Sequence, residues 1–358
     1  MAVLNLYLND LQLENSVPQS VVHPEALAWC CNVRRVMQAT GVLENKVRKS
    51  TLWSPFFITG KFNVRHLFKK LRALNIVDDE TGRKLDFFGM DYEQRCMFVD
   101  QMLADEAEGL SEKIRRIPQL AEAMAAENQF VLGMMAVNGI DGGRAGSDLG
   151  EVLLKVRGGF DIFANYPHRS ISTVRSVWSG KVKRGDILAA LPKHGYPWVW
   201  ANLNPRVTHK MGHLAIITKD IEETTDIYSK CTVECMLKKG VHQRTMKNWD
   251  TPHYVLGVQK IIWHWNSKDG LLRKEAIPVE DTAALADMAE KFIGHTYVRW
   301  YEIVTCKWVA PLRFTCSTLV WWCAKKAYGF SVSNWLYAYT TPTDILRNPA
   351  TYIKTQVK

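Results

Sequence analysis

Cys316 is the residue of this sequence best suited to nucleophilic chemistry. It opens a segment whose apolar residues recur at helical spacing until Gly329, a residue that commonly ends a helix. The positive N-terminal end of a helix stabilises a thiolate, which is the nucleophilic form of cysteine. The pattern therefore allows a nucleophilic cysteine, and an inert buried cysteine is the alternative that composition leaves open.

A second group of side chains has the types that bind zinc. Its spacing is C-x3-C-x6-H-x10-H, formed by Cys231, Cys235, His242 and His253. The pattern does not favour a metal site, because Cys235 follows Glu234 on a predicted strand and would face the other way. The Gly-rich segment 139–150 lacks the Gly-Lys-Ser/Thr of a phosphate-binding loop. The sequence predicts neither a metal nor a cofactor.

The elements that would position Cys316 are a run of strands followed by helices in the second half of the chain. Strands are expected at 185–191, 212–218, 232–237, 241–246 and 253–265, with the third and fourth paired as a hairpin. Helices are expected at 281–293 and 315–328. Strands followed by helices indicate an α+β domain.

The first half of the chain has helical periodicity and no catalytic spacing. Helices are expected at 24–37, 64–74 and 92–107. Another is expected to begin at Ser111, to be broken or kinked by Pro118, and to continue over 119–136. The segment 139–150, rich in glycine, is the expected boundary. We therefore expect a mostly helical domain over 1–150, with a recruitment, loading or partner-docking role, and a catalytic domain over 151–358.

Four motifs in the second half resemble a known family in their order and spacing. They are Gly-Asp-Ile at 185–187, Gly-His-Leu-Ala-Ile at 212–216, Val-Glu-Cys at 233–235 and Phe-Thr-Cys-Ser-Thr-Leu-Val at 314–320. This part of the chain resembles the circularly permuted NlpC-type papain-like cysteine hydrolases, which include YiiX-like proteins and lecithin retinol acyltransferase relatives. Gly-His-Thr-Tyr-Val at 294–298 and Thr-Pro-Thr-Asp at 341–344 resemble further elements of that family. The resemblance covers about half of the chain and implies a papain-like fold with a short antiparallel sheet and packed helices.

The resemblance also implies a role for each matched residue. Cys316 would attack an acyl carbon to form a thioester, and His213 would take the thiol proton and later return one to the leaving group. Glu234 would hold the imidazole, by the logic of a Cys-His-Glu triad. The Tyr297 hydroxyl would support the oxyanion beside the backbone N–H of Cys316.

The charge of the chain is concentrated in the same half. The whole chain carries +10, of which residues 1–150 contribute −2 and residues 151–358 contribute +12. A basic module rich in tryptophan suits an anionic partner, although a solvated basic surface is the plainer explanation. Peptidoglycan is the favoured anionic polymer and an acidic lipid is the alternative. No nucleic-acid motif supports the charge, so nucleic acid is not expected.

The sequence lacks an apolar run long enough to span a membrane and a recognisable secretory signal. The favoured function is a murein peptidase or amidase, made in the cytoplasm and exported without a signal peptide. As a toxin or effector delivered by a specialised secretion system, it would have secretion-apparatus, chaperone or immunity-protein partners. A lipid-directed acyltransferase or thioesterase and a non-catalytic binding module are the two alternatives.

Overall fold

The computed structural model describes residues 68–69, 71–117, 120, 171–190, 213–237, 239–249, 253–299, 306–333 and 340–357. The chain divides into two compact units. Unit 1 comprises Met1–Leu149, Lys260–Ile277 and Trp335–Tyr337, and unit 2 comprises Gly150–Gln259, Pro278–Asn334 and Ala338–Lys358.

None of the helices in the described ranges is long and apolar enough to cross a membrane.

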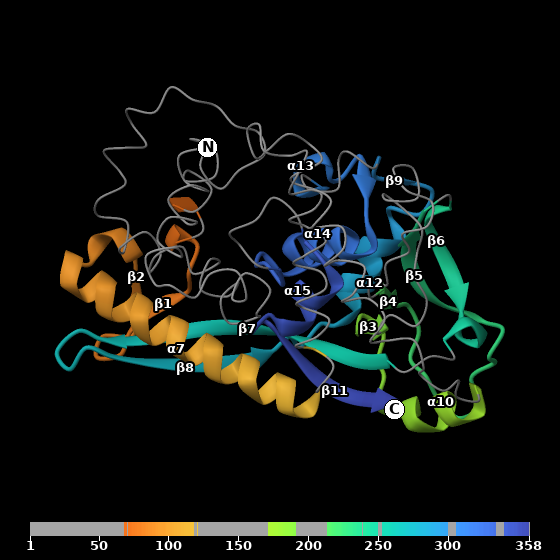
Figure 1. The fold of residues 1–358 in the computed structure, drawn as a ribbon, viewed down its shortest axis with the longest axis horizontal. Helices are drawn as coiled ribbons and strands as arrows, with labels where there is room; N and C mark the ends of the chain where they lie inside the picture. Colours follow the sequence, from red (N-terminus) through yellow and green to blue (C-terminus); the bar gives the residue numbers. More distant parts are fainter. Residues whose placement is uncertain are drawn as a thin grey trace, which may run out of the picture. The chain divides into compact units, whose positions relative to one another are not determined.

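Unit 2 is built on an antiparallel sheet, whose strands lie in the order β7-β3-β4-β5-β6, with β11 also paired to β7. These strands are β3 (Ile187–Ala190), β4 (His213–Ile217), β5 (Lys230–Met236), β6 (Gly240–Thr245), β7 (His253–Asn266) and β11 (Thr351–Val357). The predicted strands and the β5–β6 hairpin are confirmed. β11, which was not predicted from the sequence, adds a strand from the C-terminal end of the chain (Figure 1).

Helices and short strands of unit 2 pack around this sheet. They are α10 (Ile171–Trp178), η3 (Met246–Asn248), α12 (Ala283–Glu290), β9 (Thr296–Tyr297), α13 (Cys306–Val309), β10 (Arg313–Phe314), α14 (Cys316–Tyr328) and α15 (Pro342–Arg347). Helix α14 packs against α12, β4 and β5. Short parallel strands β9 and β10 pair just before α14 begins.

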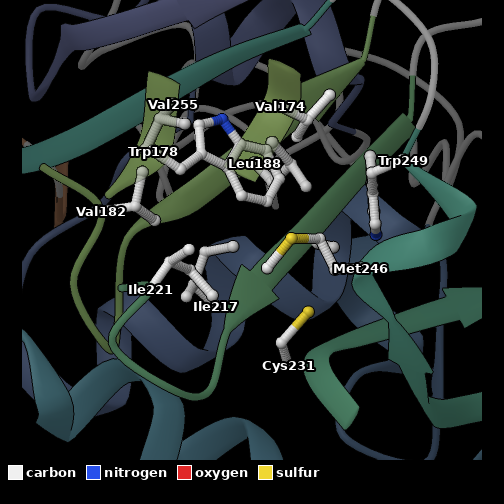
Figure 2. Close-up of a cluster of buried hydrophobic side chains, with 11 residues drawn as sticks. Val174, Trp178, Val182, Leu188, Ile217, Ile221, Cys231, Met246, Trp249 and Val255 are labelled. Carbon is white, nitrogen blue, oxygen red and sulfur yellow. The ribbon is translucent and has the colours of Figure 1, made fainter. Parts of the chain in front are cut away.

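One face of the unit 2 sheet closes over a core of buried apolar side chains (Figure 2). Trp178 of α10 is fully buried there, among residues of β3, β4, β5 and β7. Trp249, which follows η3, belongs to the same cluster and is 2% exposed. This tryptophan connects the core to the polar site described below.

Unit 1 is described mainly by one long helix and a β-hairpin. Its elements are β1 (Ile76–Asp78), β2 (Lys84–Leu85), η1 (Phe87–Gly89), α7 (Tyr92–Arg116), the end of β7, and β8 (Leu271–Pro278). Strand β1 pairs in parallel with the end of β7. Helix α7 runs along the hairpin (Figure 1), and its Gln101 bonds to the backbone of Gly270 and Leu272.

Helix α7 corrects one prediction from the sequence. The helix expected to begin at Ser111 is the continuation of α7, which runs unbroken from a capping box at Asp91 to Arg116. Its contacts with the hairpin, including the ion pair between Asp105 and Lys274, hold the helix continuous through Gly109.

The predicted α+β class is confirmed, as a mainly antiparallel sheet with separate helices and with the parallel pairs β1–β7 in unit 1 and β9–β10 in unit 2. The helix predicted at 24–37 and the predicted boundary at 139–150 lie outside the described residues.

Candidate active site

Cys316 is the first residue of α14. Thr315 caps the helix in a reciprocal capping box, because its hydroxyl accepts the N–H of Thr318 at 3.0 Å while the Thr318 hydroxyl accepts the N–H of Thr315. Ser317 donates its hydroxyl to the carbonyl of Thr340 at 2.7 Å. These bonds fix the first turn of α14, and Cys316 sits there with 9% of its surface exposed.

His213 and Glu234 lie on neighbouring strands of the sheet. His213 begins β4, and Glu234 lies on β5 in register with Ala215. Because side chains alternate along a strand, His213 and Ala215 share a face of β4, and Glu234 projects from the same side of β5. The result is a contact of 2.8 Å between Nε2 of His213 and Oε2 of Glu234.

The Glu234 carboxylate is fully buried and has further partners on β6. Nη1 of Arg244 lies 3.0 Å from Oε1 and 3.3 Å from Oε2. Nε2 of His242 lies 3.4 Å from Oε1, while its Nδ1 donates to the carbonyl of Gly240 at 3.0 Å. A buried carboxylate is stable only when it is paired, and Arg244 together with His213 meets that need.

The charges of this cluster set the protonation of its members. Burial opposes the charge of His213, but the Glu234 carboxylate and the Cys316 thiol outweigh burial and raise the pKa of His213 well above 6.5. Burial also opposes the charge of Glu234, but His213 and Arg244 outweigh it and lower the pKa of Glu234. The cluster therefore favours an imidazolium beside a carboxylate.

His213 interacts with Cys316 as well as with Glu234. Cys316 is one of the groups that raise the pKa of His213, through charge and through hydrogen bonding. Since Nε2 of His213 is held by Glu234, Nδ1 is the ring nitrogen left for the sulfur. The three side chains thus form a row of carboxylate, imidazole and thiol.

Trp249 stacks on the imidazole of His213. Its ring lies nearly parallel to the His213 imidazole, with centroids 5.9 Å apart and 19° between the planes. The guanidinium of Arg244 lies 5.8 Å from the centre of the same tryptophan. Trp249 and Arg244 therefore restrict the positions of His213 and Glu234 from outside the row.

Sequence reasoning missed Arg244 and Trp249, and it considered His242 only as a zinc ligand. The signal for the two β6 residues was their spacing, because residues two apart on a strand share a face. Once the hairpin register is known, His242 lies directly opposite Glu234, and Arg244 follows on the same face. Trp249 lies beyond the hairpin, and its contact with His213 had no local signal.

Tyr297 lies on β9, opposite Phe314 of β10. The parallel pairing of these two strands places Tyr297 near the start of α14, and the N–H of Val298 donates to the carbonyl of Phe314 at 3.0 Å. A role of the Tyr297 hydroxyl at an oxyanion stays a prediction.

The residues of the zinc pattern have other surroundings. Cys231 belongs to the apolar core of Figure 2, and the Cys235 thiol donates to the carbonyl of Phe314 at 3.2 Å. Burial raises the pKa of Cys231 to about 12 and raises that of Cys235 further. Among the described residues, no group of three or more His, Cys, Asp or Glu side chains has the arrangement of a metal site.

No known protein-family pattern, characterised protein or solved structure matches this chain significantly. The geometry of the site must carry the functional argument by itself.

Proposed function

We propose that this protein is a cysteine hydrolase that cleaves an acyl bond, most naturally an amide, through a thioester on Cys316, in a domain with a permuted papain-like arrangement. The observation that carries the proposal is the row formed by Glu234, His213 and Cys316. A buried carboxylate that orients an imidazole against a thiol at a helix N-terminus is the arrangement that nucleophilic catalysis requires.

The steps follow from the positions of these groups. His213, whose raised pKa favours the imidazolium, holds the proton that the Cys316 thiol gives up, and the sulfur attacks the acyl carbon to give a tetrahedral oxyanion. The C–N bond then breaks, His213 gives the proton to the leaving amine, and a thioester remains. Water activated by the imidazole adds to the thioester, which releases the acid and restores the thiol.

The backbone at the start of α14 supports the oxyanion. The first N–H groups of a helix have no acceptor within the helix. Thr315 accepts the N–H groups of Thr318 and Leu319, which leaves those of Cys316 and Ser317 for an oxyanion.

The surroundings of the other buried cysteines also support the choice of Cys316. Burial raises the pKa of Cys231 to about 12, and it raises the pKa values of Cys235 and Cys323 further still. These three thiols are poor nucleophiles near neutral pH.

The substrate proposed first is the peptide of peptidoglycan. Peptidoglycan is an anionic polymer, and the +12 charge of residues 151–358 would attract it. A lipid-directed acyltransferase or thioesterase is the second candidate. It is favoured by three exposed aliphatic side chains on turns near the start of α14, among them Leu312, which is 74% exposed.

The test combines thiol labelling with product analysis. We expect iodoacetamide to modify Cys316 faster than the other three buried cysteines, as read by peptide mass mapping of the native protein. Murein sacculi and acyl lipids are then incubated with wild type, Cys316→Ala and Cys323→Ala. Cys323 is the matched control because it is a fully buried cysteine on the same helix.

Turnover of either substrate by wild type and Cys323→Ala, with loss in Cys316→Ala, is the expected result. Turnover that persists in Cys316→Ala would refute the proposed nucleophile. The masses of the products distinguish peptide cleavage from release or transfer of an acyl chain.

A further inference from the structure

Three turns of unit 2 each present a large aliphatic side chain to solvent. Leu237 lies in the β5–β6 turn, Ile293 lies between α12 and β9, and Leu312 lies between α13 and β10. Their exposed fractions are 48%, 43% and 74%. Single exposed aliphatic residues are common on protein surfaces, but three on adjoining turns call for an explanation.

Hydrogen bonds through His295 join the three turns. The N–H of Val241, which follows the β5–β6 turn, donates to the carbonyl of His295 at 2.7 Å. The N–H of Gly294 donates to the carbonyl of Val241 at 2.9 Å. Nδ1 of His295 donates to the carbonyl of Pro311, beside Leu312, at 3.0 Å. The three turns that carry the aliphatic side chains are therefore joined to one another through their backbones.

Aromatic packing supports this surface from below. Phe292 contacts the His295 ring edge to face, with centroids 5.2 Å apart, and contacts Phe314 with centroids 5.0 Å apart. Phe314 is fully buried. Ile293 and Leu312 are therefore exposed next to aromatic side chains, Phe292 and Phe314, that pack together.

The charged residues within these turns are all basic, although Glu290, which pairs with Arg184, directly precedes the second turn. Segments 236–241, 291–299 and 309–314 contain Lys and Arg but neither Asp nor Glu. Lys239 and Lys291 are exposed, and within the described parts of the chain neither makes an ion pair. We call Leu237, Ile293, Leu312, Lys239 and Lys291 together the turn surface.

We propose that the turn surface docks onto an anionic phospholipid bilayer. Its aliphatic side chains would enter the boundary between headgroups and acyl chains, and its lysines would lie at the level of the lipid phosphates. Aliphatic side chains gain free energy in the acyl region, and exposed lysines are attracted to acidic lipids. A hydrated carbohydrate polymer offers the lysines a partner but offers the aliphatic side chains none. The proposal does not depend on Cys316 being a nucleophile.

The test is sedimentation of the full chain with vesicles of phosphatidylcholine and phosphatidylserine, compared with vesicles of phosphatidylcholine alone. Two variants disrupt the turn surface, Leu312→Asp and the double variant Lys239→Glu/Lys291→Glu. Two matched controls lie outside it. Leu271→Asp changes a leucine that is 58% exposed on β8, and Lys84→Glu reverses an exposed lysine on β2.

We expect wild type to bind the anionic vesicles, to bind neutral vesicles much more weakly, and to lose binding as salt rises. One lysine near an anionic surface changes partitioning about fivefold, so the double reversal should lower it by at least about 20-fold. Loss of an inserted leucine should lower it about tenfold. Both control variants should bind like wild type, except for a small effect of net charge in Lys84→Glu.

Four results would overturn the proposal. They are no binding of wild type to anionic vesicles, full binding by Leu312→Asp, equal losses in the controls and the turn-surface variants, and sedimentation with murein sacculi in place of vesicles. Because the altered side chains are exposed, the variants should keep the wild-type circular dichroism spectrum, which verifies folding before binding is compared.

Discussion

The ion pair between Glu234 and Arg244 allows the electrostatics of the site to be tested quantitatively. The Arg244→Met variant keeps an unbranched side chain and removes the guanidinium, which faces the Trp249 ring and whose Nη1 lies 3.0 Å and 3.3 Å from the two carboxylate oxygens. Opposite unit charges about 4 Å apart attract by about 4 kcal/mol at an effective dielectric constant of about 20. Since 26% of the Arg244 side chain is exposed, water screens part of this attraction.

The expected cost of Arg244→Met is about 2–3 kcal/mol in the free energy of opening the β5–β6 hairpin. It falls somewhat below the ~3–5 kcal/mol for breaking a fully buried pair, because His213 still faces Glu234. The Glu234→Gln/Arg244→Met double variant should lose less than the sum of the single variants, by about 1–2 kcal/mol.

Hydrogen exchange of β5 and β6 peptides, measured by mass spectrometry, reports this local free energy. Arg273→Met is the matched control, because Arg273 pairs with Asp79 but is 69% exposed, and its loss should be below about 1 kcal/mol. Single-variant costs that add to the double-variant cost within about 0.5 kcal/mol would refute the coupling. A loss in Arg273→Met as large as that in Arg244→Met would refute the role of burial.

Three further predictions concern the His213 pKa, the pH dependence of stability and the β5–β6 turn. Glu234→Gln should lower the pKa of His213, followed by NMR titration of the imidazole; an unchanged pKa would show that Glu234 does not set it. The His213 contribution to stability is complete below its ordinary pKa of 6.5 and is lost as pH rises through the raised value, whereas that of Glu234 is complete above 4.5 and is lost as pH falls through the lowered value. Wild type should therefore exceed Glu234→Gln in stability most between pH 4.5 and 6.5, as measured by unfolding at several pH values. Gly240→Ala should destabilise the protein by more than about 2 kcal/mol, because φ is +65° and a Cβ would overlap the His295 carbonyl. Gly82→Ala is the control, because Gly82 has φ +66° but lies in open space, and it should cost only about 1 kcal/mol. Thermal unfolding measures both costs. Equal costs at the two glycines would refute the overlap.

The strands around the site were predictable because their sequences are locally consistent. Segments 212–218 and 253–265 are rich in β-branched and other apolar residues. The turn at Lys239-Gly240 separates two short segments with β-branched residues. β8 was missed because its side chains are mostly exposed and lack an apolar face. β11 was missed because a short polar strand becomes recognisable only when β7 pairs with it.

The site was predictable only as far as each residue has a signal of its own. Cys316 has one in the helix that it begins, whereas His213 and Glu234 were identified through a resemblance to a family. Arg244 on β6 and Trp249 beyond the hairpin are ordinary residue types whose local sequence gives no signal of a site. Their contacts depend on the register of β5 and β6 and on the bulge in that register between Lys230 and Thr232, which spacing along the chain does not determine.

The long strand β7 determines how the protein can be divided into fragments. Residues up to Gln259 belong to unit 2, Lys260–Ile277 belong to unit 1, and the chain returns to unit 2 at Pro278. The chain leaves unit 2 after Gln259 and returns to it at Pro278, and these two points are close together. The N–H of Val279 donates to the carbonyl of Val258 at 3.0 Å.

A fragment that begins at residue 151 would therefore keep a piece of unit 1 without the residues that cover it. Trp263 and Trp265 are buried against Phe98 of α7, with ring centroids 6.2 Å and 5.8 Å apart. In such a fragment both tryptophans would face water at the end of a protruding hairpin, which favours aggregation. Removing 260–277 as well, and joining the adjacent strand ends with a tight turn, would give a version of unit 2 without this exposed surface.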